Sequence, residues 1–213
     1  MNDPAGFVRA NTSLIAPPLV PEIRLHLATE LVPIWRSTEE ELAEAGVPPP
    51  YWAFAWAGGQ ALARYVLDHP QTIRGRAVLD FGAGSGLIAI AAARAGAGRV
   101  VAADIDAFAI AAIAMNAEEN GVAVAITTRD VIGETGIAET ILVGDMCYER
   151  PLADRVLNWL AALKKDGAAI LIGDPGRTYF PKKSFERLAT YFVKTTRELE
   201  DREIRETGVY RLV

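Results

Sequence analysis

Cysteine and histidine are scarce in this 213-residue chain, which holds one cysteine, Cys147, and two histidines, His26 and His69. A single cysteine excludes an intramolecular disulfide and any zinc site built from several cysteines. The two histidines lie far apart in the sequence, so we expect no metal site. Nothing beside Cys147 in the sequence would activate a thiolate, which argues against a nucleophilic role for it.

Basic charge and long apolar stretches are also in short supply. The net charge is −5, and nothing resembles the Lys/Arg clustering of a nucleic-acid-binding surface. No stretch approaches the ~20 apolar residues that a membrane-spanning helix needs. Residues 1–20 have neither the apolar core of a signal peptide nor the arginines of a transit peptide. We therefore expect no nucleic-acid partner, no membrane contact and a cytoplasmic location.

Strand-like and helical segments alternate from Ala77 onward, which is typical of an α/β fold with a parallel sheet. A further helix is expected near residues 184–191. Segments 192–199 and 205–212 are rich in β-forming residues and are expected to close the sheet as a hairpin. The strands expected in the alternating region are 77–80, 99–103, 122–128, 140–144 and 168–173, and its helices are 87–95, 107–119 and 152–164.

The chain before Ala77 is expected to pack on this core within a single domain that spans residues 1–213. Residues 1–20 are expected to form a flexible arm and residues 21–70 an N-terminal extension. Strict alternation over residues 22–27 predicts a strand. Capping-box spacing predicts a short helix over residues 37–46, and apolar residues at helical spacing predict another over 60–67.

A glycine-rich loop, residues 80–86 (DFGAGSG), follows the first strand of the alternating region. A dinucleotide-binding loop would place its third glycine where this chain has Leu87. A P-loop is excluded because no Gly-Lys-Ser/Thr sequence follows. The spacing of Gly82, Gly84 and Gly86 favours S-adenosylmethionine, which has no phosphate to cradle and whose methionyl and ribose parts the glycine backbone can approach closely.

Five aspartates stand at or just past the ends of predicted strands, namely Asp80, Asp104, Asp130, Asp145 and Asp174. Ligands of open α/β sheets bind beyond the carboxyl ends of the strands. Aspartate also favours turns and helix caps, so chance could supply one or two of these positions. Five acids in register along one rim are better explained by a binding site.

Three of these acids are expected to hold the cofactor together with the glycine loop. Asp104, followed by Ile105, is placed to accept hydrogen bonds from two ribose hydroxyls. Asp80 is placed to neutralise the amino group of the cofactor, directly or through water. Asp130 is placed for the adenine amino group, with Val131 packing against the ring.

The loop and the strand-end acids resemble those of the seven-stranded class I methyltransferases. Three more segments narrow the resemblance: residues 50–62 (PYWAFAWAGGQAL), 144–148 (GDMCY) and 173–177 (GDPGR). Together they are similar to the seven-β-strand protein-lysine methyltransferases that carry an Asp-x-x-Tyr motif. Within that group, residues 22–201 resemble the lysine methyltransferase of the electron transfer flavoprotein β subunit, in what looks like a bacterial form without a transit segment.

The resemblance implies a Rossmann-like, mostly parallel seven-stranded sheet with an antiparallel C-terminal strand. It also implies methyl transfer from S-adenosylmethionine to lysine side chains of a protein, here the electron transfer flavoprotein β subunit. Two positions depart from the family pattern. Ala57 stands where the family often has proline, and Ser85 stands where the vertebrate relative has cysteine. Neither side chain is expected to touch a catalytic atom.

The Asp-x-x-Tyr motif corresponds to Asp145 and Tyr148, which we expect to be the catalytic pair. The attacking lysine must be neutral, and with an ordinary pKa of ~10.4 this costs roughly 4–5 kcal/mol at pH 7. The positive sulfur lowers that cost, whereas a carboxylate favours the ammonium. We therefore interpret Asp145 as capturing and aligning the lysine, not as a strong base. Tyr148 either shapes the acceptor channel or is a core aromatic beneath the loop.

Several positions keep two interpretations. Trp52 and Trp56 either pack the N-terminal segment over the sheet or cover the cofactor and the substrate channel, with Trp56 near the methionyl end. Asp174 and Arg177 either form an ion pair that fixes their loop, or Arg177 faces the protein substrate. Another acceptor, such as a ribosomal protein or a small amine, stays open. So do a nicotinamide-dependent oxidoreductase and a non-catalytic cofactor-binding scaffold. We expect a monomer.

Overall fold

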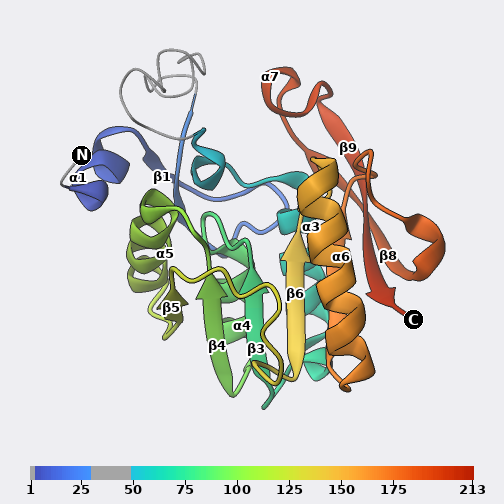
Figure 1. Ribbon diagram of the computed structural model, residues 1–213. Coiled ribbons are helices and arrows are strands. Elements are labelled where there is room, and N and C mark those ends of the chain that lie inside the picture. Colours follow the sequence, from blue (N-terminus) through green and yellow to red (C-terminus); the bar gives the residue numbers. More distant parts are fainter. Residues whose placement is uncertain (1–2, 30–48) are drawn as a thin grey trace.

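The computed structural model describes residues 3–29 and 49–213, and its centre is a seven-stranded sheet of order β5-β4-β3-β6-β7-β9-β8 (Figure 1). The expected parallel core with an antiparallel C-terminal strand is confirmed, because β9 (Ile204–Leu212) runs antiparallel to both β7 and β8. The parallel strands are β3 (Ala77–Phe81), β4 (Arg99–Ala103), β5 (Ala125–Thr127), β6 (Thr140–Gly144) and β7 (Ala169–Asp174).

Helices cover both faces of the sheet, as Figure 1 shows with α6 in front and α3 and α4 behind. Alternate residues of β3 pack into the apolar layers on the two faces of the sheet. Val78 packs with α3 and α4, whereas Leu79 packs with α6. A strand buried on both faces reads as a continuous apolar run, which is why these segments stood out in the sequence. The helices are α3 (Ala57–Asp68), α4 (Leu87–Arg94), α5 (Ala107–Glu119) and α6 (Arg150–Lys165).

The helix expected near residues 184–191 is wrong, because this segment belongs to strand β8 (Phe185–Lys194), which follows the single turn η4 (Lys182–Ser184). β8 pairs with β9 along its length and packs Phe185 against Phe180 at a ring distance of 5.0 Å. The pairing register shifts between Arg187 and Ala189. Such an irregularity interrupts the two-residue period of a strand, so the alternation was not visible in the sequence.

Residues 3–20, expected to be part of a loose arm, contain the helix α1 (Pro4–Ala10) and the strand β1 (Ser13–Ile15). The side chain of Asp3 caps α1 by accepting a hydrogen bond from the amide of Gly6. Val8 is fully buried, and the ring of Phe7 lies 4.8 Å from that of Phe108 in α5. These apolar contacts hold the segment on the core.

β1 pairs antiparallel with β2 (Leu25–Leu27), so the strand predicted over residues 22–27 forms only at its end. The helix predicted over residues 37–46 lies outside the described residues. In the described parts of the chain, no helix combines the length and apolarity that crossing a membrane requires. A short turn η2 (Tyr51–Ala53) then leads into α3, and a second, η3 (Pro70–Thr72), follows it.

Candidate active site

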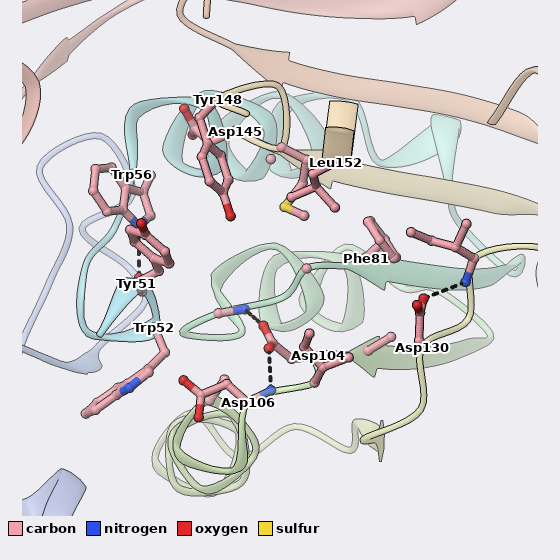
Figure 2. A pocket seen from close by; sticks show the side chains of 18 of the residues that line it. Tyr51, Trp52, Trp56, Phe81, Asp104, Asp106, Asp130, Asp145, Tyr148 and Leu152 are labelled. Atoms are coloured by element: carbon pink, nitrogen blue, oxygen red, sulfur yellow. Dashed lines mark hydrogen bonds between the residues drawn. The ribbon is translucent and has the colours of Figure 1, made fainter. Parts of the chain in front are cut away.

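A cavity of about 590 Å³ opens beyond the carboxyl ends of the parallel strands, where ligands of α/β proteins bind (Figure 2). The glycine loop and the ends of β4 and β6 form one side of it, and the segment before α3 forms the other. Its lining includes the sequence-predicted residues Trp52, Trp56, Gly82, Gly84, Asp104, Ile105, Asp130, Asp145, Tyr148 and Arg177.

The glycine loop needs glycine at each of its three positions. Gly82, Gly84 and Gly86 have φ values of +65°, +52° and +80°, a region that other residues adopt with strain. A Cβ on Gly82 would fall 2.5 Å from the sulfur of Met146, whereas one on Gly84 would have no neighbour nearer than 3.7 Å. Gly84 therefore presents bare backbone to the cavity, as close approach by a ligand requires. Gly86 caps α4 and does not line the cavity.

Asp104 is held by two backbone amides at the edge of the cavity. Its Oδ2 accepts a hydrogen bond from the amide of Gly84 at 2.8 Å, and its Oδ1 accepts one from the amide of Asp106 at 3.0 Å. Each carboxylate oxygen can accept two hydrogen bonds, so each keeps capacity for another donor. The neighbouring Ile105 is 76% exposed and lines the same cavity, which leaves its apolar surface free to cover a flat ligand ring.

Asp130 borders the cavity, whereas Val131 does not. The Oδ2 of Asp130 accepts a hydrogen bond from Arg155 at 2.8 Å, and its Oδ1 accepts one from the amide of Ile132 at 3.1 Å. Val131 is buried in the layer beneath α6, and Ile132 takes its place in the lining. An apolar contact to a bound ring at this point therefore comes from Ile132, whereas the sequence predicted Val131.

Asp80 lies beneath the glycine loop and not in the wall of the cavity. It is fully buried, and its Oδ2 accepts a hydrogen bond from the amide of Ala89 at 2.9 Å. Its Oδ1 has no hydrogen-bond partner among the described residues. Burial raises the pKa of Asp80 from 3.8 to about 7. In this position the carboxyl group binds the backbone of α4, the helix that follows the glycine loop.

Asp80→Asn is expected to stabilise the protein more at pH 8 than at pH 5. Because the pKa of Asp80 is raised on folding, the folded chain keeps a proton that the unfolded chain releases between about pH 4 and 7. This contribution to stability is therefore lost as the pH rises through that window. The variant lacks the titrating group, so its advantage over the parent should grow by about 2–3 kcal/mol between the two pH values. Urea unfolding at both pH values measures this, and an unchanged advantage would contradict the assignment.

Asp145 stands at the end of β6 in the left-handed backbone region, with φ of 58°, which aspartate tolerates better than most residues. Its Oδ1 accepts two hydrogen bonds from Arg177, from Nε at 3.0 Å and from Nη2 at 2.7 Å. Its Oδ2 accepts one from the amide of Gly59 in the first turn of α3, at 3.1 Å. Burial raises the pKa of Asp145, Arg177 opposes this, and the charges of Glu200 and Asp174 raise it further.

The side-chain ion pair expected between Asp174 and Arg177 is replaced by a different arrangement. Asp174 is fully buried outside the cavity, and its Oδ1 accepts hydrogen bonds from the backbone amides of Gly176 and Arg177 at 2.6 and 2.7 Å. Asp174 thus fixes the loop through its backbone. The guanidinium of Arg177 turns instead to Asp145 and Glu200. With these bonds made, Arg177 has little donor capacity left for a protein substrate.

The two tryptophans before α3 have different surroundings. Trp52 is 1% exposed and stacks on Phe108 at a ring distance of 6.3 Å, so most of its surface packs the N-terminal segment on α5. The indole Nε1 of Trp56 donates a hydrogen bond to the carbonyl of Tyr51 at 2.8 Å, and the guanidinium of Arg177 lies 5.7 Å from its ring. Of the two, Trp56 is the better placed to cover a ligand.

Tyr148 lies at the mouth of the cavity and not beneath the loop. It is 39% exposed, and its ring lies 5.6 Å from that of Tyr51 (Figure 2). Burial raises the pKa of Tyr148 to about 12, so its hydroxyl is protonated at neutral pH. Together the two tyrosines form an aromatic rim through which an acceptor side chain would reach Asp145.

Besides Ile132, sequence reasoning missed other residues of this site, among them Tyr51 and Glu200. Tyr51 belongs to the aromatic segment 50–62 that carries the family resemblance, so its position was a signal that could have been used. Glu200 gave no such signal, because it stands in an ordinary charged stretch far along the chain. Only the folded structure brings it against Arg177, with Nη2–Oε1 and Nη1–Oε2 distances of 2.8 and 3.0 Å.

Comparisons with known proteins agree with this architecture. A family model described as ribosomal protein L11 methyltransferase (PrmA) matches residues 61–173. The electron transfer flavoprotein beta subunit lysine methyltransferase of Xenopus laevis is 40% identical over 97% of this chain and 86% of its own length. The ribosomal protein L11 methyltransferase of Dechloromonas aromatica is 41% identical, but over 47% of this chain and 34% of its own.

Among solved structures, magnesium protoporphyrin IX methyltransferase (ChlM) from Synechocystis PCC 6803 with bound SAM superposes with a TM-score of 0.53 and 18% identity, covering 73% of this chain and 80% of that one. The sheet order, the glycine loop and these matches define a class I, S-adenosylmethionine-dependent methyltransferase. Within that class, the chain belongs to the family of electron transfer flavoprotein beta subunit lysine methyltransferases, since its identity to them extends over nearly its whole length.

Proposed function

We propose that this enzyme methylates lysine side chains of the electron transfer flavoprotein β subunit. The observation that carries the proposal is the extent of the match, because an alignment over 97% of the chain, at 40% identity, spans the positions of both Trp56 and Arg177. Both lie at the acceptor side of the cavity and outside residues 61–173, the span of the L11 methyltransferase model. A monomeric state, a cytoplasmic location and the absence of a nucleic-acid partner belong to the same proposal.

The residues at the cavity fit S-adenosylmethionine, which when bound supplies an electrophilic methyl group on a positive sulfur. The exposed backbone of Gly84 fits close approach by the cofactor, and the free lone pairs of Asp104 fit two ribose hydroxyls. Ile105 and Ile132 supply apolar surface for the adenine ring, beside the carboxylate of Asp130. Asp80 binds the backbone of α4, the helix that follows this loop.

Asp104→Asn is expected to weaken binding of S-adenosylhomocysteine by at least ~10-fold. The substitution replaces an acceptor oxygen by an NH₂ group, which cannot accept from a ribose hydroxyl and opposes one of the two amides that Asp104 now binds. Asp154→Asn is the control, because Asp154 is exposed on α6 and does not line the cavity. Calorimetric titration should show the control within about threefold of the parent, and equal losses in both variants would refute the role of Asp104.

Asp145 offers a hydrogen-bond acceptor to an incoming lysine on the acceptor side of the cavity. A carboxylate accepts about four hydrogen bonds. Arg177 and Gly59 use three of these on Asp145, which leaves one for an N–H of the amine. Because Arg177 already neutralises much of the charge of Asp145, this carboxylate favours an ammonium less than an unpaired one would. Asp145 can thus align the neutral amine after the lysine ammonium has released its proton to solvent.

Labelled S-adenosylmethionine tests the proposal directly. The enzyme is incubated in parallel with purified electron transfer flavoprotein, with ribosomal protein L11 and with a whole-cell lysate. The proposal expects label on the flavoprotein β subunit, assigned to lysine by peptide mass spectrometry, and a single lysate band at the size of that subunit. Label confined to L11, or to a small-amine fraction, would replace the flavoprotein as the substrate.

A further inference from the structure

Glu200 is a buried acid in a segment that also holds the exposed charged residues Arg197, Asp201, Arg202 and Glu203. It ends the short helix α7 (Arg197–Glu200), which lies in the connection between β8 and β9, yet it is only 3% exposed. Both of its carboxylate oxygens accept from Arg177, and Oε1 also accepts from the amide of Ala57 at 3.4 Å. Arg205 adds a longer ion pair, with its Nε 3.9 Å from Oε2 of Glu200. Burying a carboxylate is costly unless it is paired, and these partners compensate that cost.

The guanidinium of Arg177 bridges two buried acids. Its Nε and Nη2 donate to Asp145, and its Nη1 and Nη2 donate to Glu200, which together use four of its five N–H groups. The guanidinium is planar and rigid, so an acid on each edge sets its position and its tilt. Its Cζ atom lies over the ring of Trp56, 5.7 Å from the ring centroid.

Both acids also meet the first turn of α3, where Ala57 donates to Glu200 and Gly59 donates to Asp145. The positive end of a helix favours negative charge, so this turn and Arg177 together stabilise two neighbouring carboxylates. Asp145 alone could not hold the guanidinium from both sides. Glu200 therefore supplies the second of the two contacts that fix Arg177.

We propose that Glu200 is a positioning residue for methyl transfer, which holds Arg177 against Asp145 and thereby keeps the one free acceptor site of Asp145 directed to the incoming lysine. The expected effect of Glu200 on the rate of methyl transfer rests on the proposed function. The structural part of the inference, the hold of Glu200 on Arg177, does not depend on which protein is the substrate. The two parts are therefore tested separately.

The position of Arg177 is tested by fluorine NMR of protein labelled with 5-fluorotryptophan, in which Trp56→Phe assigns the Trp56 resonance. Glu200→Gln is expected to shift this resonance, because the guanidinium moves relative to the Trp56 ring. The matched control is Glu203→Gln, in the same connection, where Glu203 is exposed and pairs with Arg197 at 3.1 Å. It should leave the resonance in place. An unmoved Trp56 resonance in Glu200→Gln overturns the inference, whatever the substrate proves to be.

The catalytic part is tested by a double-mutant cycle on kcat. Glu200→Gln is expected to lower kcat about 10-fold with KM for S-adenosylmethionine within about twofold of the parent, while Glu203→Gln changes neither. If Glu200 acts through Arg177, the same substitution in an Arg177→Gln background should cost less than about twofold. A full 10-fold loss in that background, or a rise in KM without a loss of kcat, would refute the positioning role.

Glu200→Asp keeps the negative charge, and it replaces Glu200→Gln in both experiments if the glutamine variant folds poorly. It should retain more kcat than Glu200→Gln and shift the Trp56 resonance less, and the reverse order would count against the inference. If the parent enzyme leaves the flavoprotein unlabelled, the proposed substrate fails. The fluorine spectra then still decide whether Glu200 holds Arg177, and the cycle is measured on the acceptor that the lysate labelling reveals.

Discussion

Asp145→Asn is expected to lower kcat for methyl transfer about 100-fold, which corresponds to ~2.7 kcal/mol of transition-state stabilisation. The carboxylate of Asp145 accepts hydrogen bonds from Arg177 and from the amide of Gly59. Asparagine replaces one of the carboxylate oxygens by an NH₂ group, which donates hydrogen bonds and cannot accept them. In the variant this NH₂ group would face the N–H groups of Arg177 or Gly59, or the incoming amine, without forming a hydrogen bond. Asparagine also tolerates the left-handed backbone at this position, so the loss should not come from a displaced loop.

Kinetics and calorimetry together separate this role from cofactor binding. Because Asp145 lies at the acceptor side of the cavity, affinity for S-adenosylhomocysteine should stay within about threefold of the parent. Asp154→Asn is a suitable control, since Asp154 is exposed on α6 and should change neither quantity. Turnover equal to that of the parent would remove Asp145 from the mechanism, and a matching loss of cofactor affinity would reassign it to the cofactor site.

The cofactor half of the site was predictable from the sequence because its signals are local. The loop from Gly82 to Gly86 and the acid at Asp104 occupy fixed offsets from strand ends, and the strands are apolar runs buried on both faces. The cavity then gathers these positions simply because parallel strands end on one rim. Two predictions in this half were wrong. Ile132 lines the cavity where Val131 was expected, and Asp80 is buried away from the cavity that it was expected to face.

The acceptor half was less predictable because its contacts are long-range. Arg177 was expected to pair with Asp174, three residues away, and that aspartate does bind its backbone. Its guanidinium, however, reaches Asp145 and Glu200, which are 32 and 23 positions distant. No local pattern marks Glu200 as buried. The hairpin was predicted, but its first strand was expected over residues 192–199, whereas β8 ends at Lys194 and α7 follows it.

Gly58→Ala is expected to destabilise the protein by about 3 kcal/mol and to lower Tm by about 6–12 °C. The first turn of α3 lies against the end of β7 so closely that a Cβ on Gly58 would fall 2.2 Å from the carbonyl oxygen of Gly173 and 2.4 Å from Oδ2 of Asp145. The first obstacle is backbone, which no side-chain rotation relieves. The helix would have to move off the strand, and it would carry the amide of Gly59 away from Asp145.

Gly59→Ala is the matched control in the same helical turn. A Cβ at Gly59 would meet nothing within 4 Å, and the substitution keeps the amide that donates to Asp145. Since alanine favours a helix over glycine by up to ~1 kcal/mol, this variant should be as stable as the parent or slightly more so. Thermal unfolding and kcat of both variants decide the matter. If only Gly58→Ala loses stability and turnover together, close packing of α3 on β7 is what holds the acceptor site in place, whereas equal behaviour of the two variants would contradict it.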